Sequence, residues 1–249
     1  MNQYLRNRGF TMIEMAIVLL ILGLLLGGGL TVLSTQVEMQ KTKDTQRALE
    51  EAKEALIGFA VANGRLPCPA SAASNGVESP AGGGVCTNPN DGFLPGVTLG
   101  LPNIDANGYV TDGWQTVANR IRYAVSTANG NAATTLDGIR NTTIQTFGAI
   151  GNTGHLYVCA SAAGITATTC GTPANTLTTN AVAVLFSLGK NAPTGGTGVD
   201  EAANLNADRI FVSHTPVQVG GAGGEFDDMV TWLPMNILFN RMLQANRLP

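Results

Sequence analysis

The sequence is poor in charged and in aromatic residues. Asp, Glu, Lys and Arg make up 12% of its 249 residues, and Phe, Trp and Tyr make up 6%. The formal net charge is −3, so the chain lacks the strongly basic balance of a dedicated nucleic-acid-binding protein. A role in DNA uptake or adhesion would need a local basic or aromatic patch. The abundance of Gly, Ser, Thr, Asn and Ala favours a loop-rich β domain outside the cytoplasm over a cytosolic enzyme.

Catalytic motifs are missing as well. The sequence has no Gly-x-Ser-x-Gly nucleophile elbow. Its Gly-rich runs, 195–198 and 220–224, lack the Lys-Ser/Thr pair of a phosphate-binding loop. His155 and His214 each lie in a strand-like run with no nucleophile that the pattern would pair with them. The sequence therefore predicts that the protein is not an enzyme.

The N-terminal 33 residues carry a distinct pattern. A short basic leader, 1–9, contains two Arg and ends at Gly9, and an apolar run follows in which Glu14 is the one charged residue. The run is long enough to cross a bilayer, which takes about 20 apolar residues, so we expect 10–33 to form a membrane-spanning half-helix. A carboxylate in such a segment costs roughly 2.5 to 3.5 kcal/mol, which marks Glu14 as a functional residue.

The junction between Gly9 and Phe10 is the candidate cleavage site. An ordinary secretory signal is cut after its apolar core, whereas the small-residue junction here lies before it. Cleavage after Gly9 would leave the apolar helix on the mature protein and create a new amine on Phe10. That amine would lie about one helical turn from Glu14 of its own chain, or next to Glu14 of a neighbouring subunit. We expect it to pair with Glu14. A signal anchor with a stray Glu is the plain alternative.

A family resemblance rests on the basic leader, on Gly9, Phe10, Thr11, Ile13 and Glu14, and on the uncharged run after them. With these residues the sequence resembles the type IV pilin superfamily, which includes type IV pilins, minor pilins and type II secretion pseudopilins. The resemblance implies that a prepilin peptidase cuts after Gly9 and methylates Phe10. It also implies that Glu14 helps to dock each subunit into a helical filament.

The same resemblance implies a location and partners. The precursor would wait in the bacterial inner membrane with its head in the periplasm, and an inner-membrane assembly platform would add it to a filament of other pilins. The filament would be an extracellular pilus; the alternative is a type II secretion pseudopilin in a short periplasmic piston. The large, loop-rich head favours the pilus.

The helical pattern continues beyond the apolar run. Residues 36–62 contain no Pro and place apolar side chains at three- and four-residue spacing, and Asn63-Gly64 supplies a stop signal. We therefore expect one spine helix over 10–62. The alternative is two helices with a hinge at the Gly triplet 27–29, because Gly is a poor helix former. The remainder, 63–249, is expected to be a globular extracytoplasmic head.

The head is expected to complete a pilin-like α+β fold, in which an antiparallel sheet packs on the spine helix. A long connection rich in Gly, Pro, Asn and Ser, 71–113, precedes the strands. No helical pattern separates most of the strand-like runs, which favours antiparallel pairing. Residues 130–150 could hold a short helix, and 234–247 predict a final helix. The predicted strands are 120–126, 155–160, 181–187, 209–214 and 229–233.

Four cysteines, Cys68, Cys86, Cys159 and Cys170, lie in the part of the chain predicted to be outside the cytoplasm. An even number of Cys in an oxidising compartment indicates disulfides, for which three pairings exist. We expect the local pairing, 68 with 86 and 159 with 170, because each pair lies within one loop region. A zinc site is the rival, but no Cys-x-x-Cys is present.

Acidic residues gather in two loops of the head. Asp200 and Glu201 follow the Ser187-Leu188-Gly189 turn, while Glu225, Asp227 and Asp228 precede Trp232. These loops resemble the calcium-binding loop of major pseudopilins, with a longer segment between the Ser-Leu-Gly and the acids. The resemblance implies a calcium site at Asp200, Asp227 and Asp228, since calcium binds carboxylate and carbonyl oxygens. The alternative, which acids in Gly-rich loops favour, is two solvated acidic turns and no cofactor.

Overall fold

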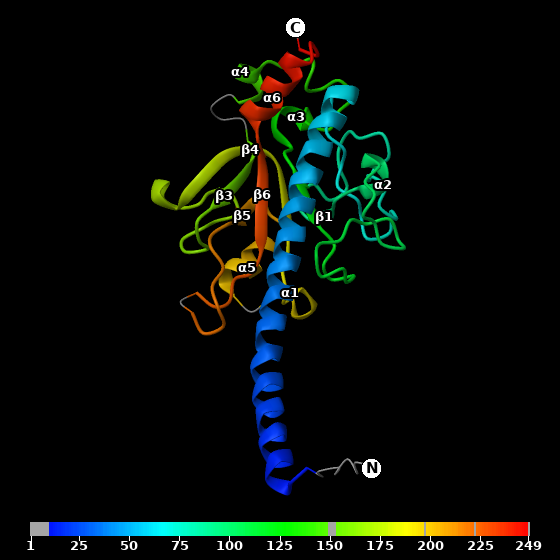
Figure 1. Cartoon of the computed structure of the whole chain (residues 1–249). Coiled ribbons are helices and arrows are strands. Elements are labelled where there is room, and N and C mark those ends of the chain that lie inside the picture. The colour runs from blue at the N-terminus through cyan, green and yellow to red at the C-terminus, as the bar shows by residue number, and fades with distance from the viewer. Residues whose placement is uncertain (1–9, 149–152, 197, 222, 249) are drawn as a thin grey trace, which may run out of the picture. The chain divides into compact units, whose positions relative to one another are not determined.

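The computed structural model describes residues 10–148, 153–196, 198–221 and 223–248, except for the side chains of 25–33. The chain divides into two compact units, Met1–Lys41 and Thr42–Pro249, and the division falls within the first helix. That helix, α1, spans Met12–Asn63 (Figure 1). It is continuous through the Gly triplet 27–29, so the alternative of two separate helices is not realised.

The first unit contains the beginning of α1. Large apolar side chains from Phe10 to Leu24 are exposed along it, among them Met12 at 94% and Phe10 at 83%. Across the described residues, no helix combines the length and the hydropathy that a membrane span requires. The structure therefore does not support the expected membrane-spanning half at 10–33, where the side chains of 25–33 lie outside the description.

In the second unit, residues 42–63 of α1 pack against the sheet. The buried positions recur every three or four residues, which places them on one face of the helix. They meet Tyr123, Leu185 and Leu233 of the sheet in the main core. Fully burying a Leu side chain such as Leu49 or Leu56 contributes about 1.5 to 3 kcal/mol. The buried α1 residues of this face are Leu49, Ala52, Leu56 and Ala60.

The sheet has six strands in the order β1-β2-β4-β3-β5, with β6 paired to β4. β2 and β6 both pair with residues 183–186 of β4, so they flank that half of β4 on opposite edges. β3 pairs with the first half of β4, from 176 to 181. The strand bounds are β1 Gly92–Phe93, β2 Arg122–Val125, β3 Leu156–Cys159, β4 Thr176–Ser187, β5 Ile210–Val212 and β6 Met229–Pro234.

The sheet is mixed, which corrects the expectation of an antiparallel one. β3 and β5 are parallel, with Tyr157 opposite Ile210 and Cys159 opposite Val212. Parallel neighbours need a crossover connection. Here the chain leaves the end of β4, passes through the short helix α5 (Val199–Asn204) and returns along the outer side of β3. A helix of six residues is too short to give a periodic signal in the sequence.

The curled sheet closes a second apolar cluster on the face opposite α1. Alternation along β4 sends Leu185 to the α1 side and Phe186 to the other side. Phe186 there meets Phe211 of β5 at a ring-centroid distance of 5.5 Å, with Leu156 and Val158 of β3 beside them. Both faces of β4 are therefore buried over residues 181–187.

Short helices and one longer helix complete the head. The predicted final helix is present as α6 (Met235–Gln244), which buries Leu238, Phe239 and Met242. The ambiguous stretch 130–150 contains α4, and α3 overlaps its start. The remaining elements are α2 (Gly96–Leu99), α3 (Ala128–Asn131), α4 (Ile144–Phe147) and the 3-10 turns η1 (Pro173–Asn175) and η2 (Ala192–Thr194).

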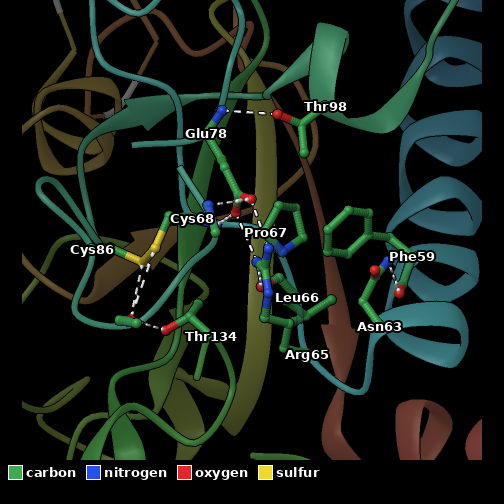
Figure 2. A network of polar contacts seen from close by, with 12 residues as sticks. Phe59, Asn63, Arg65, Leu66, Pro67, Cys68, Glu78, Cys86, Thr98 and Thr134 are labelled. Carbon is green, nitrogen blue, oxygen red and sulfur yellow. Dashed lines mark hydrogen bonds and ion pairs between the residues drawn. A yellow bond between two sulfur atoms is a disulfide. The ribbon is translucent and has the colours of Figure 1, made fainter. Parts of the chain in front are cut away.

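The disulfides follow the local pairing expected from the sequence. Cys68 is bonded to Cys86, and Cys159 is bonded to Cys170. Beside the first bridge, the carboxylate of Glu78 accepts hydrogen bonds from Arg65 and from the Cys68 N–H at 3.0 Å (Figure 2). It also accepts the Gly82 N–H at 3.1 Å. The disulfide and the carboxylate together hold the first part of the long connection against the end of α1.

Candidate functional site

The start of α1 is organised by Thr11 and Glu14. Thr11 precedes the first helical residue, and its hydroxyl accepts the Glu14 N–H at 3.3 Å. In return, Glu14 Oε2 accepts both the Thr11 N–H and the Thr11 hydroxyl at 2.8 Å. This reciprocal arrangement is a capping box, which satisfies backbone donors that a helix start leaves without partners.

Glu14 therefore already has a partner within its own chain. Gly9 lies outside the described residues. The carboxylate of Glu14 contacts Thr11. The sequence predicts a different partner, the amine that cleavage would create on Phe10, one residue earlier. The signal for Thr11 was present in the sequence, because Thr-x-x-Glu before an apolar run is the pattern of a capping box.

An apolar surface surrounds this helix start. Met12, Ile13 and Met15 are exposed, as are large apolar side chains on every face of the helix up to Leu24. A contiguous apolar surface of this kind marks a contact with other protein or with lipid. Within the described side chains of 10–24, Glu14 is the one charged group on it.

A second candidate site lies in the head, where Glu201, Asp227 and Asp228 converge. α5 supplies Glu201, and the two Asp lie just before β6. One carboxylate oxygen from each residue lies within 4.8 Å of the other two. Of the predicted set, Asp227 and Asp228 are brought together, and Glu201 is the third member.

Asp200 points elsewhere. Its Oδ1 accepts the Ala162 N–H at 2.5 Å, and its Oδ2 lies 3.0 Å from His214 Nε2. Successive residues of a helix point about 100° apart, so α5 cannot direct both Asp200 and Glu201 at the same place. The sequence showed the adjacent acids but gave no indication of which one faces β6.

Burial dominates the electrostatics of this cluster. It raises the pKa of Asp228 to about 8 and that of Asp227 to about 6, and the charge of Glu201 adds to both. Asp228 Oδ2 accepts from Asn204 at 2.8 Å, and Asp227 Oδ2 accepts from the Lys190 N–H at 2.7 Å. Among the described residues, Oδ1 of each Asp is buried without a hydrogen-bond donor. Such oxygens fit a hard cation such as calcium.

Comparison with known proteins identifies the N-terminal site. Residues 4–30 match the family model described as the prokaryotic N-terminal methylation motif.

The chain carries a prepilin-type signal.

This signal belongs to type IV pilins and pseudopilins, and it indicates a prepilin of that general kind. It implies a structural subunit, processing by a prepilin peptidase and assembly into pilin filaments. A membrane-anchored precursor and an extracellular or periplasmic filament fit the same signal. No curated protein and no solved structure matches the chain, and the α+β head is compatible with a pilin-like fold.

Proposed function

We propose that the protein is a structural subunit of a type IV pilus-like helical filament. Prepilin peptidase cleaves it after Gly9 and methylates Phe10, and the apolar start of α1 then packs among the same helices of neighbouring subunits. The observation that carries the proposal is the methylation motif at 4–30, which coincides with a helix start whose apolar side chains are exposed.

In this proposal Glu14 sets the register between subunits. A carboxylate has about four acceptor positions, and Thr11 uses one of the two oxygens. The other oxygen can accept from the methylated amine of a neighbouring Phe10. Burying the carboxylate among apolar helices is tolerable when that cation is present and is penalised when a subunit docks out of step.

Two variants separate the charge of Glu14 from its capping role. Glu14→Gln keeps an acceptor for the Thr11 N–H but removes the negative charge, whereas Thr11→Ala removes the capping hydroxyl and keeps the charge. We expect Glu14→Gln to lose filament assembly and Thr11→Ala to retain most of it, scored by the subunit recovered in sheared filaments. If the two variants assemble equally, Glu14 acts only as a cap and the docking role is refuted.

Mass spectrometry of the mature N terminus tests the processing step. The expected first residue is a methylated Phe10, and a Gly9→Val variant should keep the leader. A mature chain that begins at any other residue removes the amine on which the pairing depends. Immunogold labelling of intact cells and of thin sections then separates the two kinds of filament: label on surface fibres supports a pilus, and label confined to the periplasm of the sections supports a pseudopilus.

A calcium site is a second proposal, favoured by the two donor-less oxygens of Asp227 and Asp228. Glu201, Asp227 and Asp228 would hold the ion, which would link α5 to the start of β6. An ion at one hundred times its dissociation constant adds about 2.7 kcal/mol to the free energy of unfolding.

A melting experiment with and without a chelator tests this site. Calcium should raise the melting temperature of the wild type and of Asp200→Asn, whose carboxylate faces His214, and should not affect Glu201→Gln. Equal melting temperatures of the wild type with calcium and with chelator would refute the site.

A further inference from the structure

Two edges of the sheet, those of β1 and β5, are closed by their own surroundings. Beside β1, Ala70 pairs with Phe93 through both backbone hydrogen bonds, Ala70 N to Phe93 O at 2.8 Å and Phe93 N to Ala70 O at 2.9 Å. The outer side of β1 is therefore occupied by the chain itself. Residues 228–231, at the start of β6, lie in a groove whose walls are α1 and residues 213–216.

The edge of β5 is blocked by side chains that bond to the backbone groups a neighbouring strand would use. The amide of Asn204 accepts the Val212 N–H at 2.7 Å and donates to the Val212 carbonyl at 3.2 Å. Asp208 accepts the Ile210 N–H at 2.7 Å. Buried or blocked edges of this kind are how proteins prevent edge-to-edge pairing.

The first half of β4 is different. β6 ends at Pro234, opposite Ala181, so residues 176–180 keep β3 on one side and, within the described chain, have no strand on the other. The Asn180 N–H lies 3.5 Å from the hydroxyl of Thr178, which is the limit of a hydrogen bond. Leu177 is 48% exposed, and Thr179 and Asn180 are exposed as well.

This edge also lacks the usual protective residues. Register shifts occur on its β3 side, but Thr176-Leu177-Thr178-Thr179-Asn180 contains no Lys, no Pro and no charge. The absence of charge extends well beyond the strand, because 141–189 contain no Asp, Glu, Lys or Arg. Depletion of charged residues is the compositional mark of an interface core.

We propose that this edge pairs with the same edge of a second copy of the chain, forming a continuous antiparallel sheet across two heads. One register pairs the whole edge: Thr178 faces Thr178 of the second copy, Leu177 faces Thr179, and Thr176 faces Asn180. The occupant is a second copy because this sequence complements itself. No like charges meet in that register, and Thr-Thr pairs are favourable cross-strand neighbours.

The symmetry of this contact limits what it can build. A contact in which both partners use the same surface is closed by a two-fold axis and cannot repeat into a fibre. It therefore joins two heads and stops there. Within the proposed filament it would link subunits of two filaments side by side, a role that is additional to docking along α1 and independent of cleavage after Gly9.

Cysteine cross-linking of the full chain in detergent micelles tests the register. Thr178→Cys places two thiols directly opposite each other across the two-fold axis, where Cβ atoms lie about 4.5 to 5.5 Å apart in a strand pair. Mild oxidation should then give a disulfide-linked dimer. Leu136→Cys is the matched control, because Leu136 is 69% exposed and lies outside the charge-free stretch. Peptide mapping of the two native disulfides verifies that each variant is folded.

A charge variant tests the contact independently of the thiol. The proposal predicts a concentration-dependent dimer of the wild type in sedimentation. Thr178→Lys puts like charges opposite each other and should abolish this dimer, whereas Leu136→Lys should leave it intact. The proposal is overturned if Thr178→Cys cross-links no more than Leu136→Cys. A wild-type chain that stays monomeric at all concentrations, or that binds only foreign extended peptides, overturns it equally.

Discussion

Arg65 and Glu78 form a buried, bidentate ion pair just after the C-terminal end of α1. Nη1 of Arg65 lies 2.8 Å from Oε2 of Glu78, and Nη2 lies 2.7 Å from Oε1. The two side chains are 8% and 6% exposed. The guanidinium also lies over the Phe59 ring, 5.1 Å from its centroid (Figure 2). One carboxylate thus ties the last turns of α1 to the disulfide-closed part of the connection.

Removing that carboxylate should be costly. Glu78→Gln leaves the buried guanidinium of Arg65 without its counter-charge, and breaking a buried pair costs about 3 to 5 kcal/mol. Denaturant unfolding would measure this loss. Glu51→Gln is the control, because it breaks the exposed Arg47–Glu51 pair and should cost only about 0.3 to 0.5 kcal/mol. Similar losses in the two variants would show that Glu78 is not an electrostatic anchor.

Substituting two glycines of the connection allows the cost of backbone strain to be measured separately from the cost of steric crowding. Gly76 and Gly82 both have positive φ, +72° and +88°, but a Cβ on Gly76 would lie 1.8 Å from the Gly108 carbonyl oxygen, whereas Gly82 faces open space. Gly82→Ala should cost about 1 to 2 kcal/mol from strain alone. Gly76→Ala should cost roughly 3 kcal/mol or more, because the backbone must also move. Equal midpoints in denaturant would contradict the close approach of the two loops.

His155 should make the head less stable in acid. Its Nε2 donates to the Phe147 carbonyl at 2.8 Å, and Nδ1 lies 3.2 Å from the Ser126 hydroxyl. Burial lowers the pKa of His155 below its usual 6.5, so the unfolded chain binds the proton more readily. The stabilising contribution is full above pH 6.5 and is lost as pH falls from there toward the lowered pKa. The difference between wild type and His155→Gln across pH 4 to 8 isolates this contribution from the carboxylates, and a flat difference would refute it.

Asn204 should contribute far more to the free energy of unfolding than Asn206, two residues further along the chain. Asn204→Ala leaves Val212 and Asp228 without their partners in a buried place, at about 1 to 3 kcal/mol for each lost group. It also opens the edge of β5, so we expect both a lower melting temperature and faster aggregation. Asn206 is exposed and bonds only to Asp208, so Asn206→Ala should change stability by roughly 0.5 kcal/mol. Equal aggregation of the two variants would show that Asn204 does not protect the edge of β5 from pairing with other chains.

The sequence predicted the strands well where alternation was strong. Ile121, Tyr123 and Val125 fall on one buried face, as their spacing indicates, and β3, β5 and β6 each begin within one residue of the predicted runs. β4 is longer than predicted, because Thr176–Asn180 extend it through a Thr-rich stretch that resembles a loop. β1 was missed, since a strand of two residues has no period.

The two candidate sites, the start of α1 and the acidic cluster of the head, were predictable from the sequence to different extents. Glu14 stood out because a charge in an apolar run is expensive, while its partner Thr11 depends on a local capping pattern that the sequence does contain. In the acidic cluster the sequence indicated the two loops but not which acidic side chain of α5 faces β6. Whether Asp200 or Glu201 faces Asp228 depends on the rotation of α5, which is set by tertiary packing.

The position of β6 late in the chain has a consequence for the order of folding. Residues 181–187 of β4 pair with β6 on one side, and β6 comes after β2, β3, β4 and β5 along the chain. As the chain is made N terminus first, β2 and β3 are in place while that side of β4 is still empty over all 12 residues of the strand. Arrival of residues 229–234 therefore closes one side of residues 181–187 of β4, while residues 176–180 stay open on that side.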